Sequence, residues 1–337
     1  MTIKDVARLA GVSVSTVSRV LNKHPDVSPL IREKVLEVVK EHHFIPNSTA
    51  RNLVRPRRDA VGIICLGRSN PFYPPIISQI EEMLNKAGYS MCLRFITLEE
   101  DELTYAAELE RAERLQGIVF LGGRSDYTVA ETAALTVPYV CCSFTNYFGD
   151  VPRERYSSVT MDDVACMHDV VGYLYERGHR EIGLLLPSFP NRSISELRYR
   201  GYCGALKKLE LPMREENVLF CSSFREEDGY QAVKKACQKG LNCTALVAAS
   251  DMLGVAAIRA MHEEGVRVPD DCSLISIDGL NITRYTLPAI TTLVQPQKTM
   301  GEESVRLLLD MIINKSDGQH LIVTPTIRQG ESVQRLN

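Results

Sequence analysis

The chain has 337 residues, of which 45% are hydrophobic and 24% charged, and its formal net charge is −3. This length suits two or three domains, and the composition is that of an ordinary globular protein. No apolar run is long enough to span a bilayer, and the N-terminus lacks the apolar core of a secretory signal. We therefore expect a cytoplasmic protein rather than a membrane or secreted one.

Residues 1–58 are basic, with eleven Lys and Arg against five Asp and Glu, which favours an anionic polymer as partner. Three short helices are predicted within residues 1–46. Thr2 and Asp5 form a capping pattern for the first helix, and Gly11 ends it.

The second helix is predicted from about Ser13 to Asn22, and the third from Pro29 to His43, with Ser28 as its cap. A helix, a turn that opens with glycine and a second helix are typical of a helix-turn-helix, whose second helix enters the DNA major groove. One face of that helix packs inward through valines. The short hydroxyls of the other face permit close approach and donate to phosphate oxygens, while Arg19 can donate to a guanine edge.

Residues 45–58 read as a basic linker with a short helix at 47–54, and from Ala60 onward short apolar runs alternate with helical patterns. Strands are predicted at 61–66, 117–121, 138–142, 182–186, 245–249, 273–277 and 290–294. Helices are predicted at 76–87, 162–177, 196–209, 251–264 and 297–314. This alternation predicts doubly wound parallel sheets in an α/β body, and the length suits two lobes.

A series of segments is distributed along nearly the whole chain. They are MTIKDVARLAGVSVSTVSRVLN (1–22), VS (27–28), REKV (32–35), FIPNSTARNL (44–53), SNPFY (69–73), YLYERGHREIGLL (173–185), RYRGY (198–202), SDMLGVAAIRA (250–260), GVRVPDDCSLISID (265–278) and LPAITTLVQPQKTMG (287–301). In this order they resemble the lactose-repressor (LacI/GalR) family of transcriptional regulators.

The resemblance implies an all-α helix-turn-helix head at 1–46, a hinge helix and linker at 47–58, and a two-lobed body of the periplasmic-binding-protein type I fold at 59–337. The expected first lobe comprises about 59–157 and 290–317, and the second about 158–289 and 318–337. The chain would cross between lobes near 157–160, 288–290 and 316–321. Open parallel sheets bind ligands beyond the carboxyl ends of their strands, so the effector is expected between the lobes.

The resemblance also implies which residues contact DNA. Val14 and Ser15 match the positions that vary with operator sequence, and simple packing is the alternative role for Val14. Leu53 matches the hinge leucine that wedges a base step, and an edge-of-core position is its alternative. The complete predicted set is Val14, Ser15, Thr16, Ser18, Arg19, Asn22, Asn47, Ala50, Arg51 and Leu53.

The predicted effector contacts combine aromatic faces, an arginine and hydrogen-bonding groups: Phe72, Tyr73, Arg198, Phe224, Ser250 and Asp278. Core packing of the phenylalanines and a structural ion pair between Arg198 and Asp278 are the alternatives. Ser143 and Gly279 stand where many members carry acidic or amide residues. The ligand is therefore less polyhydroxylated than a typical sugar, or anionic and bound by Arg198 with Arg68 or Arg124.

We expect a homodimeric repressor that binds a palindromic operator and responds to a sugar or sugar derivative, with no metal and no cofactor. A purine-responsive, corepressed regulator of the same fold is the alternative. An enzyme is not expected, because no Walker loop, serine elbow or Cys–His signature occurs, and the ten cysteines include no Cys-x-x-Cys spacing.

Overall fold

The computed structural model describes residues 1–21, 24, 26–42, 44, 59–68, 70–97, 99–189 and 192–336. These residues form two compact units, which divide between Arg58 and Asp59. In the described part of the chain, no helix has the length and apolarity needed to cross a membrane.

The first unit contains three helices, α1 (Ile3–Ala10), α2 (Val14–Leu21) and α3 (Pro29–Glu41). The capping pattern of Thr2 and Asp5 is confirmed, and Gly11 ends α1 at φ +66°, a left-handed conformation that favours glycine. Ser28 precedes α3 as expected, but its side chain makes no capping hydrogen bond. The small core of this unit consists of Val6, Ala7, Ala10, Val17, Val20 and Val35.

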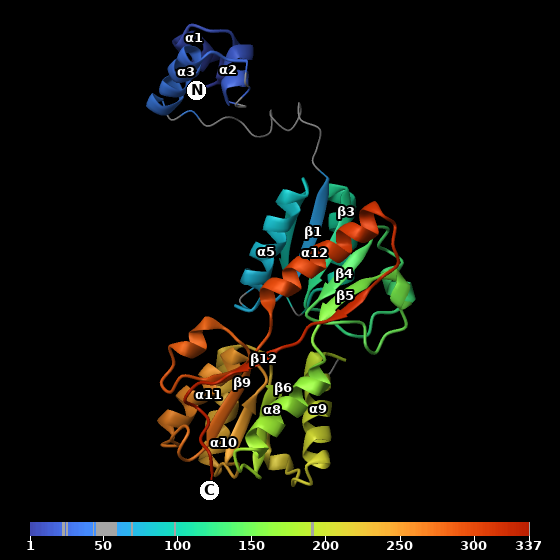
Figure 1. The fold of residues 1–337 in the computed structure, drawn as a ribbon, viewed down its shortest axis with the longest axis vertical. Helices are drawn as coiled ribbons and strands as arrows, with labels where there is room; N and C mark the ends of the chain where they lie inside the picture. Colours follow the sequence, from blue (N-terminus) through green and yellow to red (C-terminus); the bar gives the residue numbers. More distant parts are fainter. Residues whose placement is uncertain are drawn as a thin grey trace. The chain divides into compact units, whose positions relative to one another are not determined.

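The second unit is an α/β body with two six-stranded sheets (Figure 1). The first sheet is all parallel, in the order β11-β5-β4-β3-β1-β2. Its strands are β1 (Ala60–Leu66), β2 (Ser90–Ile96), β3 (Leu115–Leu121), β4 (Tyr139–Cys142), β5 (Ser157–Thr160) and β11 (His320–Ile322). We call this sheet and its helices the first lobe.

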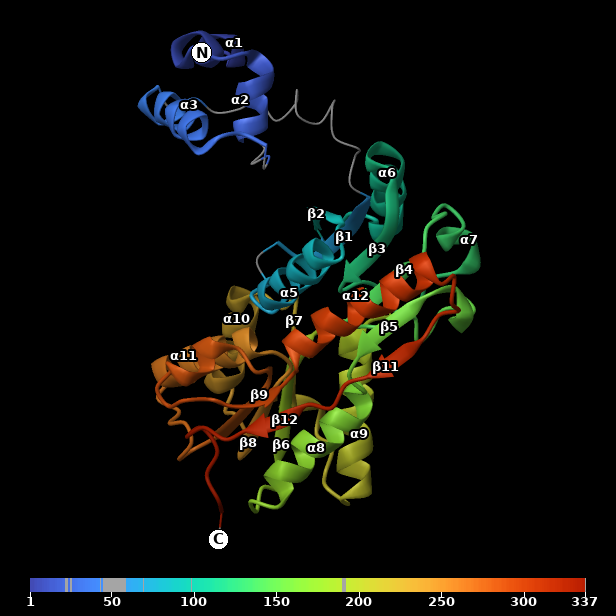
Figure 2. The ribbon, with the colours of Figure 1, turned by 45° about the horizontal axis from the view of Figure 1, so that its top comes forward.

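Both faces of the first sheet are covered. Side chains of successive strand residues point to opposite faces. Ile63 accordingly packs in the cluster that contains α5 (Tyr73–Lys86) and α12 (Gln297–Ile313), whereas Ile64 packs with α6 (Glu102–Glu113). Helices α5 and α12 lie side by side (Figure 1 and Figure 2). The short helix α7 (Val129–Thr132) precedes β4.

The second sheet has the order β12-β10-β9-β8-β6-β7, in which only the β10–β12 pair is antiparallel. Its strands are β6 (Ile182–Pro187), β7 (Val218–Cys221), β8 (Ala245–Ala248), β9 (Ser273–Asp278), β10 (Thr291–Val294) and β12 (Thr326–Arg328). Two helix pairs cover it: α8 (Asp163–Tyr175) with α9 (Ile194–Lys208), and α10 (Glu226–Gln238) with α11 (Asp251–Glu263). We call this part the second lobe.

The chain passes between the lobes three times. The first crossing follows β5, close to the expected position at 157–160. The second and third lie later than expected. β10 still belongs to the second sheet, so the chain crosses after Val294 rather than near 288–290. β11 pairs with β5 in the first sheet, so the last crossing follows Ile322 rather than residues 316–321.

Candidate functional site

Helix α2 has one buried and one open face. Val17 and Val20 are buried in the core of the first unit, whereas Val14 is 40% exposed and Ser15 and Arg19 are exposed. Helical periodicity explains this division, because Val17 and Val20, three positions apart, share one face, and Ser15 and Arg19, four positions apart, share the opposite one. Ser15 and Arg19, both predicted to read base edges, lie on the open face, and Val14, 40% exposed, lies at its edge in the first turn.

Hydroxyl groups cluster at the N-terminal end of α2. The Ser13 hydroxyl accepts a hydrogen bond from the Thr16 backbone N–H at 3.1 Å, and it lies 2.7 Å from Ser15 Oγ and 2.8 Å from Thr16 Oγ1. Ser13 thus caps the helix, and the positive end of the helix dipole points toward this polar edge. Such an edge is suited to a phosphate group.

Thr16 and Ser18 are partly buried in α2. The other predicted DNA contacts, Asn22, Asn47, Ala50, Arg51 and Leu53, lie outside the described residues.

In the body, three of the predicted effector residues, Tyr73, Arg198 and Asp278, interact where the lobes meet, and a fourth, Ser250, follows the Ala249 carbonyl that accepts from Arg198. Asp278, at the end of β9, interacts electrostatically with Arg198 of α9 and with Tyr73 at the start of α5. Ser250 caps α11 by accepting a hydrogen bond from the Leu253 N–H at 3.2 Å. All four are less than 9% exposed, so they form an enclosed polar group.

The structural ion pair with Asp278, which was the alternative to effector contact, is not the main contact of Arg198. Arg198 Nε donates to Asp163 Oδ1 at 2.9 Å, and its Nη1 donates to the Ala249 carbonyl. Burial raises the pKa of Asp163, and the adjacent guanidinium acts against that shift. Asp163, the first residue of α8, was not among the predicted site residues, because no local pattern marks it as the partner of Arg198.

A second buried carboxylate lies beside Asp278. Asp251 accepts hydrogen bonds from the hydroxyls of Ser276 and Thr292 and from the Leu280 N–H, so it ties α11 to β9 and β10. Burial, together with the charge of Asp251, raises the pKa of Asp278 to about 8. At neutral pH Asp278 is therefore mainly a neutral carboxylic acid, which can donate as well as accept a hydrogen bond.

The aromatic residues occupy different surroundings. The rings of Phe72 and Tyr73 meet edge to face at 5.4 Å, and both are buried. A Cβ atom at Gly122, where φ is +72°, would collide with the Tyr73 hydroxyl, so glycine makes room for this ring. Phe224, between β7 and α10, is half-buried against the core of the second lobe.

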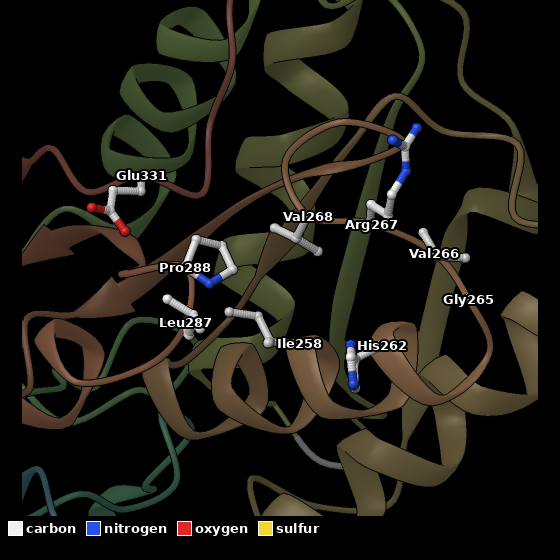
Figure 3. Close-up of a pocket in the computed structure, with 9 residues that line it drawn as sticks. All are labelled: Ile258, His262, Gly265, Val266, Arg267, Val268, Leu287, Pro288 and Glu331. Carbon is white, nitrogen blue, oxygen red and sulfur yellow. The ribbon is translucent and has the colours of Figure 1, made fainter.

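Two hollows lie near or beyond this group. One, of about 510 Å³, is lined by both lobes. Its wall includes Pro71 and Gly279, the chain neighbours of Phe72 and Asp278, and Pro75, two positions after Tyr73. The other lining residues are Glu226, Met252, Leu280, Asn281, Ile282 and Gln297. The other, of about 570 Å³, lies on the second lobe alone, between the end of α11 and Leu287–Pro288 (Figure 3). None of the predicted effector residues lines either hollow.

The lobes also touch beside the polar group. The Phe148 ring, in the segment after β4, contacts two arginines of the second lobe, with the guanidinium carbons of Arg192 and Arg200 at 4.7 and 4.9 Å from its centre. The Ser125 N–H donates to the Arg192 carbonyl at 3.2 Å. These contacts hold the lobes together on one side.

The sequence matches two family models. Residues 2–47 match the model described as bacterial regulatory proteins, lacI family, and residues 171–333 match a periplasmic binding protein-like domain.

Individual proteins match over almost the full length. The chain is 34% identical to the HTH-type transcriptional regulator MalR of Clostridium butyricum, covering 98% of this chain and 99% of that protein. It is 31% identical to the HTH-type transcriptional repressor PurR of Pectobacterium carotovorum subsp. carotovorum (strain PC1), covering 98% and 96%. Among solved structures, the transcriptional regulator CelR–cellobiose complex is similar with a TM-score of 0.73 and 28% identity, covering 98% and 99%. On this full-length similarity, the chain belongs to the lacI family of bacterial regulatory proteins.

Proposed function

We propose that this chain is a homodimeric transcriptional repressor that binds a palindromic operator and is switched by a sugar or sugar derivative between its lobes. The observation that carries the proposal is the open face of α2, where Ser15 and Arg19 are exposed opposite the buried Val17 and Val20, with Val14 exposed in the first turn. A short polar helix face of this kind fits the major groove. Because bacterial DNA lies in the cytoplasm, the proposal also assigns the protein to that compartment.

We assign distinct roles to the residues of α2. Arg19 donates to a guanine edge, Ser15 hydrogen-bonds a base, and Val14 contacts a thymine methyl. Thr16 and Ser18 contact phosphates, which sets the position of the helix but not its sequence preference. Asn22 completes the predicted contacts of this helix.

The segment 47–58 is proposed as a hinge helix and linker between the head at 1–46 and the body. Asn47, Ala50, Arg51 and Leu53 are its predicted contacts, with Leu53 wedged into a base step of the minor groove. The basic composition of this segment supports the proposal. A Leu53→Ala variant is expected to bind the operator more weakly without unfolding the body.

A homodimer is supported by exposed apolar side chains on the second lobe. Tyr285 is 81% exposed, Leu287 is 89% exposed, and Leu287 with Pro288 forms one wall of the hollow in Figure 3. Large exposed apolar side chains of this kind mark protein interfaces. A dimer also suits a small head, since two heads can read two half-sites. One structural neighbour is described as a lac repressor dimer bound to operator.

A sugar is favoured as effector. The enclosed group offers an arginine, two carboxyl groups and a tyrosine ring, a chemistry suited to hydroxyl-rich ligands. The solved relative with 28% identity is described as a cellobiose complex. The purine alternative is supported by the 31% identity to PurR. The relatives named here are regulators, which supports a binding protein rather than an enzyme.

The test is fluorescence anisotropy of the purified protein with a library of palindromic duplexes at low and moderate salt. Specific binding that weakens steeply with salt is expected, because Lys and Arg contacts release counterions from DNA. The selected duplex is then titrated with sugars and purines, and one class should change its affinity. Equal binding to all duplexes at low salt would refute the proposal.

A further inference from the structure

Arg198 is the buried cation of the enclosed group between the lobes, and its charge is already compensated. Its guanidinium is 3% exposed and donates to the carboxylate of Asp163 at 2.9 Å, and Asp163 is itself 5% exposed. Asp278, at the end of β9, interacts electrostatically with the same cation. The arginine thus interacts with two carboxyl groups, one from α8 and one from the end of β9.

The other arginines that the sequence suggested for an anionic ligand are also committed elsewhere. Arg124 is paired with three carboxylates, Glu102 at 3.8 Å, Asp126 at 3.2 Å and Glu131 at 2.8 Å. Arg68 is exposed to solvent, where water and salt screen its charge.

The charge balance therefore opposes an anion. Asp163 cancels Arg198, and Asp251 adds a further buried carboxylate, satisfied by the hydroxyls of Ser276 and Thr292. Asp278 is neutral or negative, depending on pH. A phosphate or carboxylate brought into this enclosed group would meet no uncompensated cation among Arg198, Arg124 and their partners, at a place where charge interactions are strong.

We infer that Asp163 is a specificity-determining residue that compensates the charge of Arg198 and so restricts the effector to neutral, hydroxyl- or amide-bearing molecules. The inference rests on the proposed function, because it takes the group between the lobes as the effector site. Asp163 acts on the ligand through Arg198: it holds the guanidinium in place and removes its net attraction for anions, while guanidinium N–H groups still serve neutral oxygens.

The experiment measures effector binding by calorimetry to the full-length protein with matched neutral and phosphorylated ligands. The pairs are glucose and glucose 6-phosphate, maltose and maltose 6′-phosphate, and inosine and inosine monophosphate. Wild type should bind the neutral member of one pair and discriminate against its phosphorylated partner.

The Asp163→Asn variant keeps the shape and the acceptor oxygen for Arg198 but removes one negative charge. It should improve the ratio of phosphorylated to neutral binding by about tenfold to a hundredfold, because an opposing charge a few ångströms away is lost. Adding Arg198→Gln to Asp163→Asn should abolish the gain, since the remaining site is again uncharged.

The matched control is Asp162→Asn, at the adjacent N-cap of α8. Asp162 is exposed, and its side chain accepts from the Ala165 N–H, a role that Asn performs equally well. The control should leave the ratio unchanged. A merely structural role of Asp163 would weaken both members of a pair together, and the ratio would not move.

The outcomes separate the two levels of the proposal. Tighter binding of a phosphorylated ligand by wild type, or an unchanged ratio in Asp163→Asn, would overturn the inference even where operator binding and effector response persist. If the purine pair binds, with the neutral member preferred, the assignment of a sugar as effector fails, but the inference that Asp163 restricts the site to neutral ligands is supported. Binding of none of the six ligands, despite specific operator binding, would count against both.

Discussion

The buried carboxyl group of Asp278 predicts an unusual dependence of stability on pH. Its pKa is raised from 3.8 to about 8 by burial and by neighbouring Asp251, whereas in the unfolded chain it returns to its ordinary value. Between these two values the folded protein binds more protons than the unfolded chain. The contribution of Asp278 to stability is therefore greatest at low pH and falls as pH rises toward 8.

The size of the effect follows from the number of protons released. Where the group is fully protonated in the folded protein and fully ionised in the unfolded chain, the free energy of unfolding falls by about 1.4 kcal/mol for each unit by which the pH rises. With half-titration of folded Asp278 near pH 8, the loss is about 2 kcal/mol between pH 6 and pH 8, of which about 1 kcal/mol falls above pH 7. His179 and His320 act in the opposite direction near pH 6, because burial lowers their pKa.

The assay compares wild type with Asp278→Asn, whose amide resembles the neutral acid in shape. Urea unfolding at pH 6, 7 and 8 is followed by circular dichroism, since the chain contains no tryptophan. The histidine contributions cancel in the difference between the two proteins. The variant should gain about 2 kcal/mol relative to wild type on going from pH 6 to pH 8. A difference that stays constant over this range, or that matches the exposed-site control Asp162→Asn, would refute the assignment.

Three further predictions concern DNA, lobe closure and assembly. Arg19→Ala should reduce discrimination between operator and random duplex about tenfold to a hundredfold without changing the melting temperature of the protein, because one guanine contact is lost. The measurement is gel-shift competition with Arg8→Ala on α1 as control, and selectivity that persists in Arg19→Ala would contradict the prediction. Phe148→Ala removes a ring whose centre lies 4.7 and 4.9 Å from the guanidinium carbons of two arginines of the second lobe, and it should weaken effector binding several-fold by loosening the closed lobes. An unchanged affinity in calorimetry would contradict this role of the contact. Leu287→Asp should convert the dimer to a monomer, measured by sedimentation, and should abolish tight operator binding. The control is Ile313→Asp, at an exposed apolar residue of α12. A stable dimer in Leu287→Asp would place the interface elsewhere.

The main architecture could be read from local patterns. Helical spacing predicted the three helices of the first unit, and the apolar runs predicted seven strands that the sheets contain. Those strands are central or strongly apolar. Edge strands β2 and β7 were not predicted, because their side chains are mixed in exposure. The central strand β5 and the helix α10 were also not predicted, because their sequences are polar and contain no apolar run. The short β11 and β12 exist only through pairing with distant strands.

The candidate site, like the fold, was predictable from the sequence only in part. Which residue types converge was predictable, since Tyr73, Arg198 and Asp278 follow from motif positions and do come together. The partner of Arg198 was not predictable from the sequence. Asp163 lies 35 residues earlier in the chain, on the helix packed beside α9, and no local pattern specifies that contact.

The sequence by itself determined the basic head, the alternating α/β body and the type of groups available to a ligand, because these depend on composition and on periodicity within short segments. Tertiary structure alone decided which strand joins which sheet and which charges cancel. These properties depend on burial and on distances between residues far apart in the chain. Burial sets both the protonation of Asp278 and the compensation of Arg198 by Asp163.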